Sequence, residues 1–434
     1  MAEVGHGEEL ALFQPQPVDQ GVESIEWVDY RPTGVVAAGA PLEFNVPGTG
    51  SSYIDLKGIT FSMALRILKN DGSSLKWEPG EDAKKDIVSL INMPAHSMFK
   101  TVEMYIQQKL VSNLGGMYPY KTNLDVVTGV DAATKEGVLK AQLYCADQAT
   151  LVDEEYINPH VIGLKKPDPG IRYRWGWTML SKWVQLEGRL YLDLCQQDRY
   201  LLNGLPLQFK MWPADKSFYL LSPETTPDYR VVIDDVKLRI AMVKLRPEVL
   251  LGHDEALKVM PALYPYTRSD IRTYAIPTGL NTVTVEDLFQ GKVPEQVIIG
   301  VVSSRAFTGD YKKNPYTYKH YHCNFVGFYV NGQSMPSNPL QPDFDNEKYM
   351  EAYRTLVRDE DLNITRENYM VNMCLYVLDV YGKRKKSQRM PVRAGHTRLE
   401  MKFAKPLPES VTVIVYGKFP ACMKVDRERN VTLE

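Results

Sequence analysis

The sequence predicts an all-β protein made of two similar halves, each with the size and strand content of a jelly roll. Short segments in which polar and apolar residues alternate recur along the chain between loops rich in Pro and Gly. A segment near residue 325 repeats the pattern of one near residue 102. Each half has roughly 170 to 220 residues, which suits an eight-stranded jelly roll better than a single immunoglobulin-like domain.

Bulk composition narrows the function. The chain has 434 residues, of which 44% are hydrophobic, and a net charge of −2. Such a weak charge provides no long-range field to attract nucleic acid or an acidic membrane. The five cysteines are scattered without a CxxC pair, which favours free thiols in a reducing compartment. The acidic N-terminal segment lacks an apolar signal core, and no run of about 18 apolar residues predicts a transmembrane segment.

In the first half, a segment rich in Gln, Pro, Glu and Gly at residues 1–22 predicts a mobile arm. Predicted strands follow at residues 24–30, 41–46, 53–68, 102–106, 186–194, 207–212 and 229–243. The longest of them contains a Gly kink and ends at the turn sequence Asn70-Asp71-Gly72. After residues 102–106, a polar reversal and a short extended piece lead into a helical run near residues 120–130.

Residues 246–260 break the strand pattern and can form a short helix, which we interpret as a linker. Predicted strands resume at residues 272–276, 282–285, 296–302, 321–330, 369–380, 399–403 and 411–416. Asn331-Gly332 predicts a type I′ hairpin turn, and the helix after it places Tyr349, Tyr353, Leu356 and Val357 on one face. We therefore expect an arm at 1–22, a first jelly roll at 23–248, a linker at 249–262 and a second jelly roll with a C-terminal tail at 263–434.

The internal repeat is the most informative feature of the chain. Tyr329-Val330 aligns with Tyr105-Ile106, and after a one-residue gap Ser337-Asn338 aligns with Ser112-Asn113. Each copy reads strand, reversal and helical run, which suggests one β unit used twice. The turn residues differ, since Gln107-Gln108 stands where the second half has Asn331-Gly332. A chance match of strand, turn and helix is the alternative to duplication.

His320, His322 and Cys323 are the best candidates for metal ligands. On a strand, the two histidines would point to one face at a separation suited to two ligands. No third or fourth ligand stands at a recognisable spacing, and Tyr318 and Tyr321 beside them suggest ordinary strand residues. We therefore predict no metal and no cofactor.

Catalytic motifs are missing from the sequence. There is no Gly-rich phosphate loop, GxSxG, HExxH or EF-hand pattern. Asp234 and Asp235 are adjacent, so on a strand they would face opposite sides and could not share a proton. No nucleophile or carboxylate motif surrounds the lone histidines His96, His160, His253 and His396. We predict a protein that is not an enzyme, with no catalytic residue and no small-molecule substrate.

One basic cluster stands out, formed by Lys383, Arg384, Lys385 and Lys386, with Arg389 and Arg393 after it. It could be a nuclear import signal or a loop that contacts phosphates. The alternative is a solvated loop between two strands, in which charge prevents edge pairing. We favour the solvated loop and expect nucleic-acid contact to be weak.

Seven segments follow one another in a distinctive order: YIDL at 53–56, ILKNDGS at 67–73, LDLCQQDRYLLNG at 192–204, SFYLL at 217–221, LFQGKVP at 288–294, KKNPYTYKHY at 312–321 and PLQPDF at 339–344. Taken in this order, they resemble the hexon, the major capsid protein of Polinton/Maverick elements and adintoviruses. The likeness runs from about residue 41 to residue 344 and is weaker beyond residue 363.

This resemblance implies a double jelly roll, that is, two eight-stranded β-sandwiches side by side with short helices in the loops. It implies a homotrimer whose six barrels form a pseudo-hexagonal capsomer, and capsomers that tile an icosahedral shell. The partners would be neighbouring capsomers, penton proteins and minor capsid proteins. The protein would be made in the host cytoplasm and reside in the virion capsid.

Two other functions are also compatible with the sequence. A cellular carbohydrate-binding or carbohydrate-processing β-sandwich could use the six tryptophans as sugar platforms, with Trp175-Gly-Trp177 as the most exposed-looking pair. The lack of a carboxylate pair and of a secretion signal argues against it. The other is a domesticated copy of the hexon that keeps the fold but makes no virion.

Overall fold

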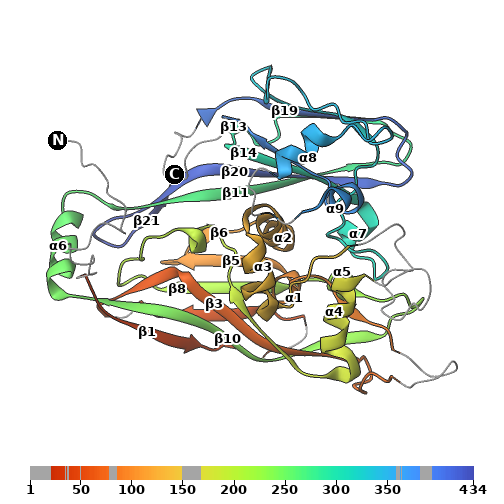
Figure 1. Cartoon of the computed structure of the whole chain (residues 1–434). Helices are drawn as coiled ribbons and strands as arrows, with labels where there is room; N and C mark the ends of the chain where they lie inside the picture. Colours follow the sequence, from red (N-terminus) through yellow and green to blue (C-terminus); the bar gives the residue numbers. More distant parts are fainter. Residues whose placement is uncertain are drawn as a thin grey trace, which may run out of the picture.

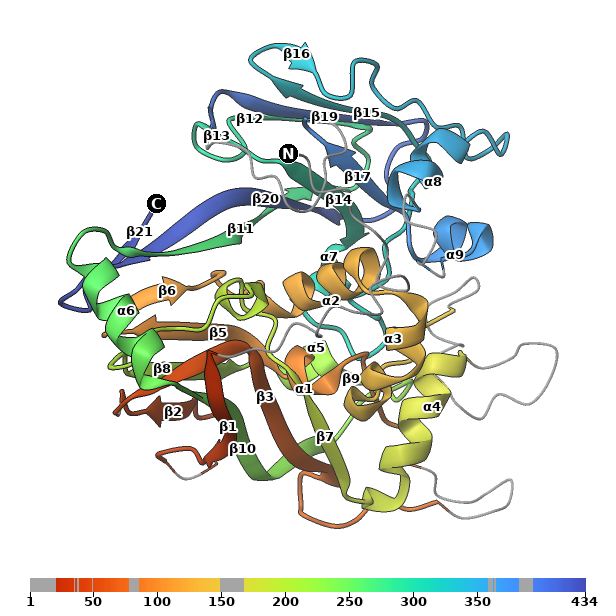
Figure 2. The same ribbon diagram turned by 60° about the vertical axis from the view of Figure 1, so that its left-hand side comes forward.

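The computed structural model confirms the predicted double jelly roll, with two β-sandwiches stacked side by side and short helices between them and at their ends (Figures 1 and 2). It describes residues 21–34, 36, 39–48, 50–77, 86–148, 168–357, 362, 364–381 and 393–434. The predicted arm at residues 1–22 lies outside the described residues except for its last two, and Val22 already belongs to a strand.

The first sandwich consists of two four-stranded sheets in the orders β1-β10-β3-β7 and β2-β8-β5-β6, and all of their pairings are antiparallel. Its strands are β1 Val22–Tyr30, β2 Leu42–Val46, β3 Ser52–Lys69, β5 Phe99–Ile106, β6 Lys109–Ser112, β7 Val184–Arg189, β8 Leu207–Pro213 and β10 Tyr229–Leu245. The short strands β4 Ser89–Leu90 and β9 Leu220–Leu221 pair beside these sheets.

The second sandwich repeats this topology with the orders β11-β20-β14-β17 and β12-β19-β15-β16. Its strands are β11 Ala262–Ile276, β12 Thr282–Glu286, β14 Gln296–Ser303, β15 Cys323–Val330, β16 Gln333–Ser334, β17 Leu375–Asp379, β19 Thr397–Phe403 and β20 Val411–Val425. The short β13 Lys292–Val293 pairs with β18 Arg393–Ala394, and β21 Val431–Leu433 pairs with β20.

The two sandwiches match strand by strand, so the repeat seen in the sequence is a repeat of structure. β5 and β15 occupy the same place in their sheets, and each pairs with the short strand that follows it. A helix then follows in each half, α2 (Tyr118–Gly129) after β6 and α8 (Met350–Leu356) after β16. The predicted equivalence of residues 102–106 and 325–330 is therefore confirmed.

The hairpin turns of the two repeats also agree. Asn331 and Gly332 have φ angles of 50° and 82°, and Gln107 and Gln108 have φ angles of 51° and 63°. Left-handed backbone at both central positions is the requirement of a type I′ turn. The first half therefore makes the same turn with two residues that disfavour it.

Helices occupy the connections. α6 (Pro247–Leu257) lies between β10 and β11, where the sequence predicted a helical linker. The remaining described helices are α1 Pro94–Ser97, α3 Ala132–Glu136, α4 Pro169–Thr178, α5 Lys216–Tyr219, α7 Ser304–Thr308 and α9 Arg366–Val371, with 3₁₀ turns η2 Val138–Gln142, η3 Met179–Ser181 and η4 Leu194–Gln196.

Several predicted strands have different limits in the structure. The strand expected at 186–194 ends at Arg189, and residues 194–196 form η4. The one expected at 369–380 is helix α9 followed by the five-residue strand β17. The one expected at 272–276 starts ten residues earlier, at Ala262. The Gly kink of the long strand is confirmed, since the β3–β10 register shifts around Gly58.

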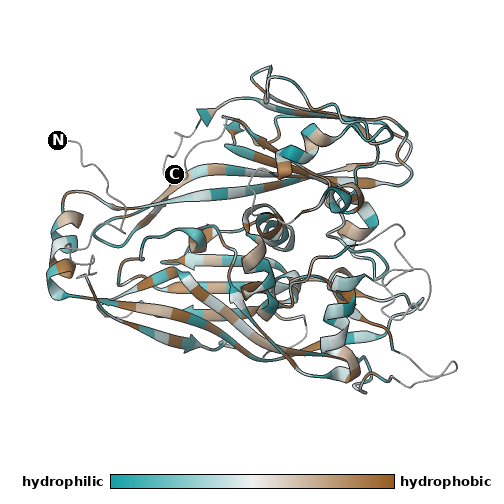
Figure 3. Cartoon of the chain, in the orientation of Figure 1, coloured by the Kyte–Doolittle hydropathy of each residue, from teal (hydrophilic) through white to brown (hydrophobic). Residues whose placement is uncertain are grey.

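The two hydrophobic cores interlock. Hydrophobic and hydrophilic residues alternate along strands such as β10, and the apolar ones meet between the sheets (Figure 3). The core of the first sandwich also contains Tyr264, Tyr266 and Met423, which belong to β11 and β20 of the second. The core of the second contains Tyr120 and Leu124 from α2 of the first. Neither core is complete without the other half.

Candidate functional site

The candidate metal ligands His320 and His322 do not lie on a strand, so the strand interpretation of their spacing is wrong. Tyr321 and His322 have φ angles of 43° and 53°, and β15 begins after them at Cys323. The ring of His320 stacks on Phe344 at 4.3 Å, and its Nδ1 accepts a hydrogen bond from the His322 backbone N–H at 2.9 Å. Burial lowers the pKa of His320 to about 4. His320 is therefore a neutral packing residue in this turn.

The other candidates also lack a constellation for chemistry. Asp235 lies at a bulge of β10 with φ 43°, and its backbone N–H donates to Asp234 at 2.8 Å. Across the described ranges, no three His, Cys, Asp or Glu side chains gather so that they could hold a metal ion. No described helix is long and apolar enough to cross a membrane. The basic cluster Lys383, Arg384, Lys385 and Lys386 lies outside the described residues.

The most elaborate polar arrangement joins the two sandwiches. Lys121 of α2 is buried and lies 2.7 Å from the carboxylate of Asp125 and 3.3 Å from that of Asp193. From the second sandwich, the Tyr416 hydroxyl donates to Asp125 at 2.8 Å. Ser269 donates to Asp193 through its backbone N–H at 2.8 Å and its hydroxyl at 2.7 Å. We call these five residues the junction network.

Electrostatics keep the junction network charged. Burial alone would raise the pKa of Asp125, but Lys121 and Lys418 outweigh it and lower that pKa to about 2. Burial alone would likewise lower the pKa of Lys121, but Asp125 and Asp193 raise it above its usual range. Breaking a buried pair of this kind leaves an uncompensated charge, at a cost of about 3–5 kcal/mol. The network therefore opposes any sliding or rotation of one sandwich over the other.

A second set of hydrogen bonds ties the halves near α4. Arg174 is fully buried, and its guanidinium donates to the Asp147 carboxylate at 2.6 Å and to the Leu90 carbonyl at 2.7 Å. Asn314 of the second sandwich donates to the other Asp147 oxygen at 2.8 Å, and Asn372 donates to the Asp147 carbonyl at 2.7 Å. Asp147 thus bridges one arginine of the first sandwich and two asparagines of the second.

Aromatic packing fills the space between these polar contacts. Tyr120 of α2 stacks on Phe307 of the second sandwich at 5.4 Å and meets Tyr316 edge-on at 5.9 Å. Phe218 of the first sandwich lies 5.8 Å from Tyr120. Such pairs each add about 0.5–1.5 kcal/mol beyond burial. The two sandwiches are therefore held in one orientation by polar and apolar contacts together.

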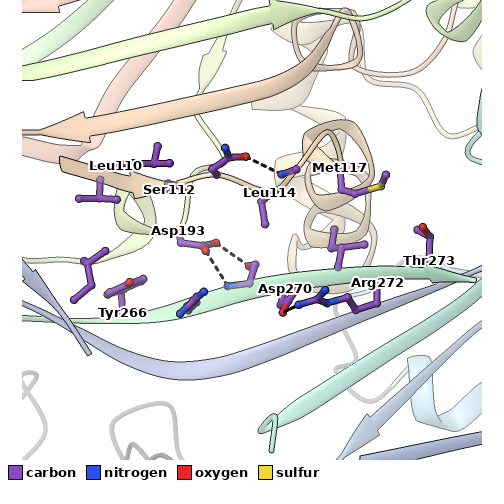
Figure 4. Close-up of a pocket in the computed structure, with 16 residues that line it drawn as sticks. Leu110, Ser112, Leu114, Met117, Asp193, Tyr266, Asp270, Arg272 and Thr273 are labelled. Atoms are coloured by element: carbon purple, nitrogen blue, oxygen red, sulfur yellow. Dashed lines mark hydrogen bonds and ion pairs between the residues drawn. The ribbon is translucent and has the colours of Figure 1, made fainter. Parts of the chain in front are cut away.

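A cleft of about 650 Å³ opens at this junction, between the end of β6 and strand β11 (Figure 4). Asp193 and Ser269 form its inner wall, and Arg268, Asp270 and Arg272 line the side formed by β11. Arg272 pairs with Asp270 at 3.0 Å. Asp193 is paired with Lys121, so three of the four charged residues of the lining already take part in ion pairs within the chain.

The tryptophans do not form the continuous platform that a sugar-binding sheet would have. Trp27, Trp177, Trp183 and Trp212 are exposed, but they lie on β1, on α4, before β7 and on β8. Trp175 is half-buried and meets Trp77 edge-on at 5.6 Å. Trp177 and Trp183 line one shallow pocket, together with Arg172 and Lys182 and without a carboxylate. That pocket lacks the paired acids that glycoside hydrolysis needs.

Sequence reasoning missed the junction network. The Lys121 and Asp125 spacing of four residues is a usable signal for a helical ion pair, although such pairs are ordinarily solvated. Asp193, Ser269 and Tyr416 are separated from Lys121 and Asp125 by 68 to 295 positions and carry no local pattern. Only the tertiary arrangement brings them together.

Comparison with known proteins shows which of them have a similar sequence or fold. No family model matches the chain. An uncharacterized protein of Caenorhabditis elegans is 23% identical over 437 residues, which span 94% of this chain and 97% of that protein. The chain aligns with a chain from the cryo-EM structure of the Sputnik virophage (TM-score 0.65, 11% identity, 100% of this chain and 93% of the other). It also aligns with the mavirus major capsid protein (TM-score 0.53, 10% identity, 94% and 90%). The fold is therefore one shared with viral major capsid proteins.

Proposed function

We propose that this protein is a viral major capsid protein, a hexon whose trimers tile an icosahedral shell. The observation that carries the proposal is the fixed junction between two jelly rolls of identical strand order. A rigid pair of similar barrels supplies a third of a six-barrel ring, so three chains related by a three-fold axis approximate six-fold symmetry. Heterologous contacts that close after three copies give such a ring.

The domain division fits this role. We assign the first jelly roll to residues 23–248, the linker to 249–262 and the second jelly roll to 263–434. α6 crosses from one sandwich to the other, and β11 begins at Ala262. In this assignment the function is geometric, and no described residue is given a catalytic role.

We further infer that the gene belongs to a Polinton/Maverick or adintovirus-like element. The ordered segments between residues 41 and 344 resemble the hexon of these elements, and the nematode relative is an animal protein of nearly the same length. The structural likeness to the Sputnik virophage chain and to the mavirus major capsid protein supports the fold. A domesticated copy that makes no virion is the alternative within this lineage.

The partners proposed for the trimer are neighbouring capsomers, penton proteins and minor capsid proteins. Contact with the genome is expected to be weak, because the net charge is −2. Replacing Lys383, Arg384, Lys385 and Lys386 with Ser should leave trimers and packaged DNA unchanged. Shells emptied of DNA by that substitution would show that this loop faces the genome.

Light scattering and electron microscopy of the purified protein test the proposal. We expect a mass three times that of the 49.4 kDa chain and hexagonal particles, or shells, in micrographs. A monomer at every micromolar concentration would contradict a capsid role. In that case, quenching of tryptophan fluorescence by oligosaccharides would test the carbohydrate-binding alternative at the pocket of Trp177 and Trp183.

A further inference from the structure

The internal repeat indicates which surfaces of two neighbouring copies are in contact in a trimer. This inference rests on the trimer proposed above. Within one chain, the contact between the jelly rolls has two unlike sides. On the first jelly roll, the contact includes α2, the helix that follows β6. On the second, it includes the strand pair β11–β20, through Ser269 and Tyr416. One side of each barrel is used in this contact.

Each jelly roll also has the counterpart of the surface that the other jelly roll uses in this contact. In the single chain, these two counterparts are exposed to solvent. β1–β10 is the topological equivalent of β11–β20, because both pairs lead the same sheet and both flank α6. None of the nine residues of β1 is buried, whereas five residues of β11 are. α8 is the equivalent of α2, and it buries three of seven residues against nine of twelve in α2.

The open face of β1–β10 has the composition of a protein interface. Residues alternate in β1, and Tyr30 packs on the core, so Ile25, Trp27 and Asp29 point away from it. Ile25 is 51% exposed and Trp27 is 56% exposed. Asp29 accepts from the Arg239 guanidinium at 2.8 Å at the edge of this apolar pair. An aromatic and aliphatic centre with a charged rim is typical of subunit contacts.

The face that would receive it lies on the second jelly roll. α8 presents Met350, 40% exposed, together with the exposed Glu351 and Arg354. This surface offers an apolar side chain for the Ile25 and Trp27 pair and charges of both signs for the Asp29–Arg239 rim. The described chain contains no segment that covers either face.

We propose that the β1–β10 face of one copy docks on the α8 side of the second jelly roll of another copy. The contact between chains then repeats the contact within a chain, barrel after barrel. Because the two faces are unlike, the contact is heterologous, and with two barrels per chain a six-barrel ring closes after three copies. Trp27 is the central residue of this interface.

Substitution of Trp27 tests the assignment. Trp27→Glu places a charge at the centre of the contact, and we expect the trimer to dissociate at concentrations about 30-fold higher than for the unmodified chain, or more. The matched control is Trp177→Glu, which alters a tryptophan of similar exposure on α4 and should leave the trimer unchanged. Light scattering gives the mass, and circular dichroism verifies that both variants are folded. A Trp27→Glu trimer as stable as the control would overturn the assignment.

Crosslinking provides a second measurement that does not depend on the Trp27→Glu variant. The chain carrying both Trp27→Cys and Met350→Cys, treated with a short bismaleimide, should give covalent dimers and closed trimers. Each single variant gives the background of the native cysteines, of which Cys145 and Cys422 are half-buried. Products that stop at dimers in every variant would indicate a different contact. An unmodified chain that is monomeric would refute the proposed function itself, whereas a trimer insensitive to both tests refutes only these faces.

Discussion

Lys121 illustrates how one residue can hold a large architecture in place. It is a lysine with almost no exposure, on a helix between two barrels, and it forms ion pairs with two aspartates at once. Burying three charges is costly, and replacing such groups by packed apolar side chains is often neutral or stabilising. The charges instead fix the relative orientation of the two jelly rolls, because each carboxylate also accepts a hydrogen bond from a residue of the other jelly roll. We therefore interpret the junction network as a device for orientation.

Removing the cation should be costly. Lys121→Met leaves Asp125 and Asp193 buried without their shared partner, and we expect the free energy of unfolding to fall by about 3–5 kcal/mol. Urea denaturation at fixed protein concentration measures it. The control is Lys57→Met, because Lys57 pairs with Asp198 at the surface and should contribute less than about 1 kcal/mol. Equal losses in the two variants would contradict the role given to Lys121.

The lowered pKa of Asp125 predicts that the free energy of unfolding decreases in acid. Its pKa in the folded chain is lowered to about 2, below its usual value near 3.8, so the folded state favours the ionised form. Its contribution, about 2 kcal/mol, is fully present above roughly pH 5 and is lost as the pH falls from about 4 to 2. Denaturation midpoints measured across this range should decline in the unmodified chain. In Lys121→Met the decline attributable to Asp125 should be absent, and an unchanged decline would refute the assignment.

At the scale of elements, the two hairpin turns form a natural comparison. Gln108 has φ 63° in the first half, and its counterpart Gly332 has φ 82°. Left-handed backbone costs an ordinary L-residue about 1–2 kcal/mol, part of which glycine loses again through unfolded-state entropy. We expect Gln108→Gly to raise the free energy of unfolding by about 0.5–1 kcal/mol.

The reverse substitution is its matched partner. A Cβ at Gly332 meets no atom within 4 Å, so Gly332→Ala tests the backbone alone and should lower the free energy of unfolding by about 1 kcal/mol. Both changes are measured by thermal or urea denaturation. Shifts of the same sign in the two variants would show that the turns are not equivalent.

Local sequence patterns predicted most strands and helices, and the wrong predictions have one cause in common. Alternation located β3 and β10, in which buried residues recur at every second position over much of the strand, and the Asn331-Gly332 signal located a hairpin. The failures came where tertiary contacts override local pattern. Residues 194–196 leave the strand pattern to form η4, and Tyr321 and His322 form a left-handed turn. The junction network could not be predicted, because its partners are distant in sequence and each is an ordinary residue alone.

At the scale of the molecule, the interlocked cores make the two jelly rolls depend on each other. Tyr264 and Met423 complete the first core, and Tyr120 and Leu124 complete the second. A domain pair joined only by a linker would have separate cores and would move as two bodies. This chain instead has the construction of a single rigid block, which suits the proposed shell subunit, because such a subunit must keep one angle between its barrels.

Unfolding of the whole chain tests whether the two jelly rolls depend on each other. All six tryptophans lie between residues 27 and 212, in the first jelly roll. Tryptophan fluorescence therefore reports on the first jelly roll, while far-ultraviolet circular dichroism reports on the whole chain. Ile298 is fully buried in the second core, and Ile298→Ala should cost about 2–5 kcal/mol. If the cores unfold together, this distant substitution lowers the fluorescence midpoint as much as the dichroism midpoint. Leu65→Ala, in the first core, is the control that must shift both. A fluorescence midpoint unmoved by Ile298→Ala would mean that the jelly rolls unfold independently and that the junction does not couple them.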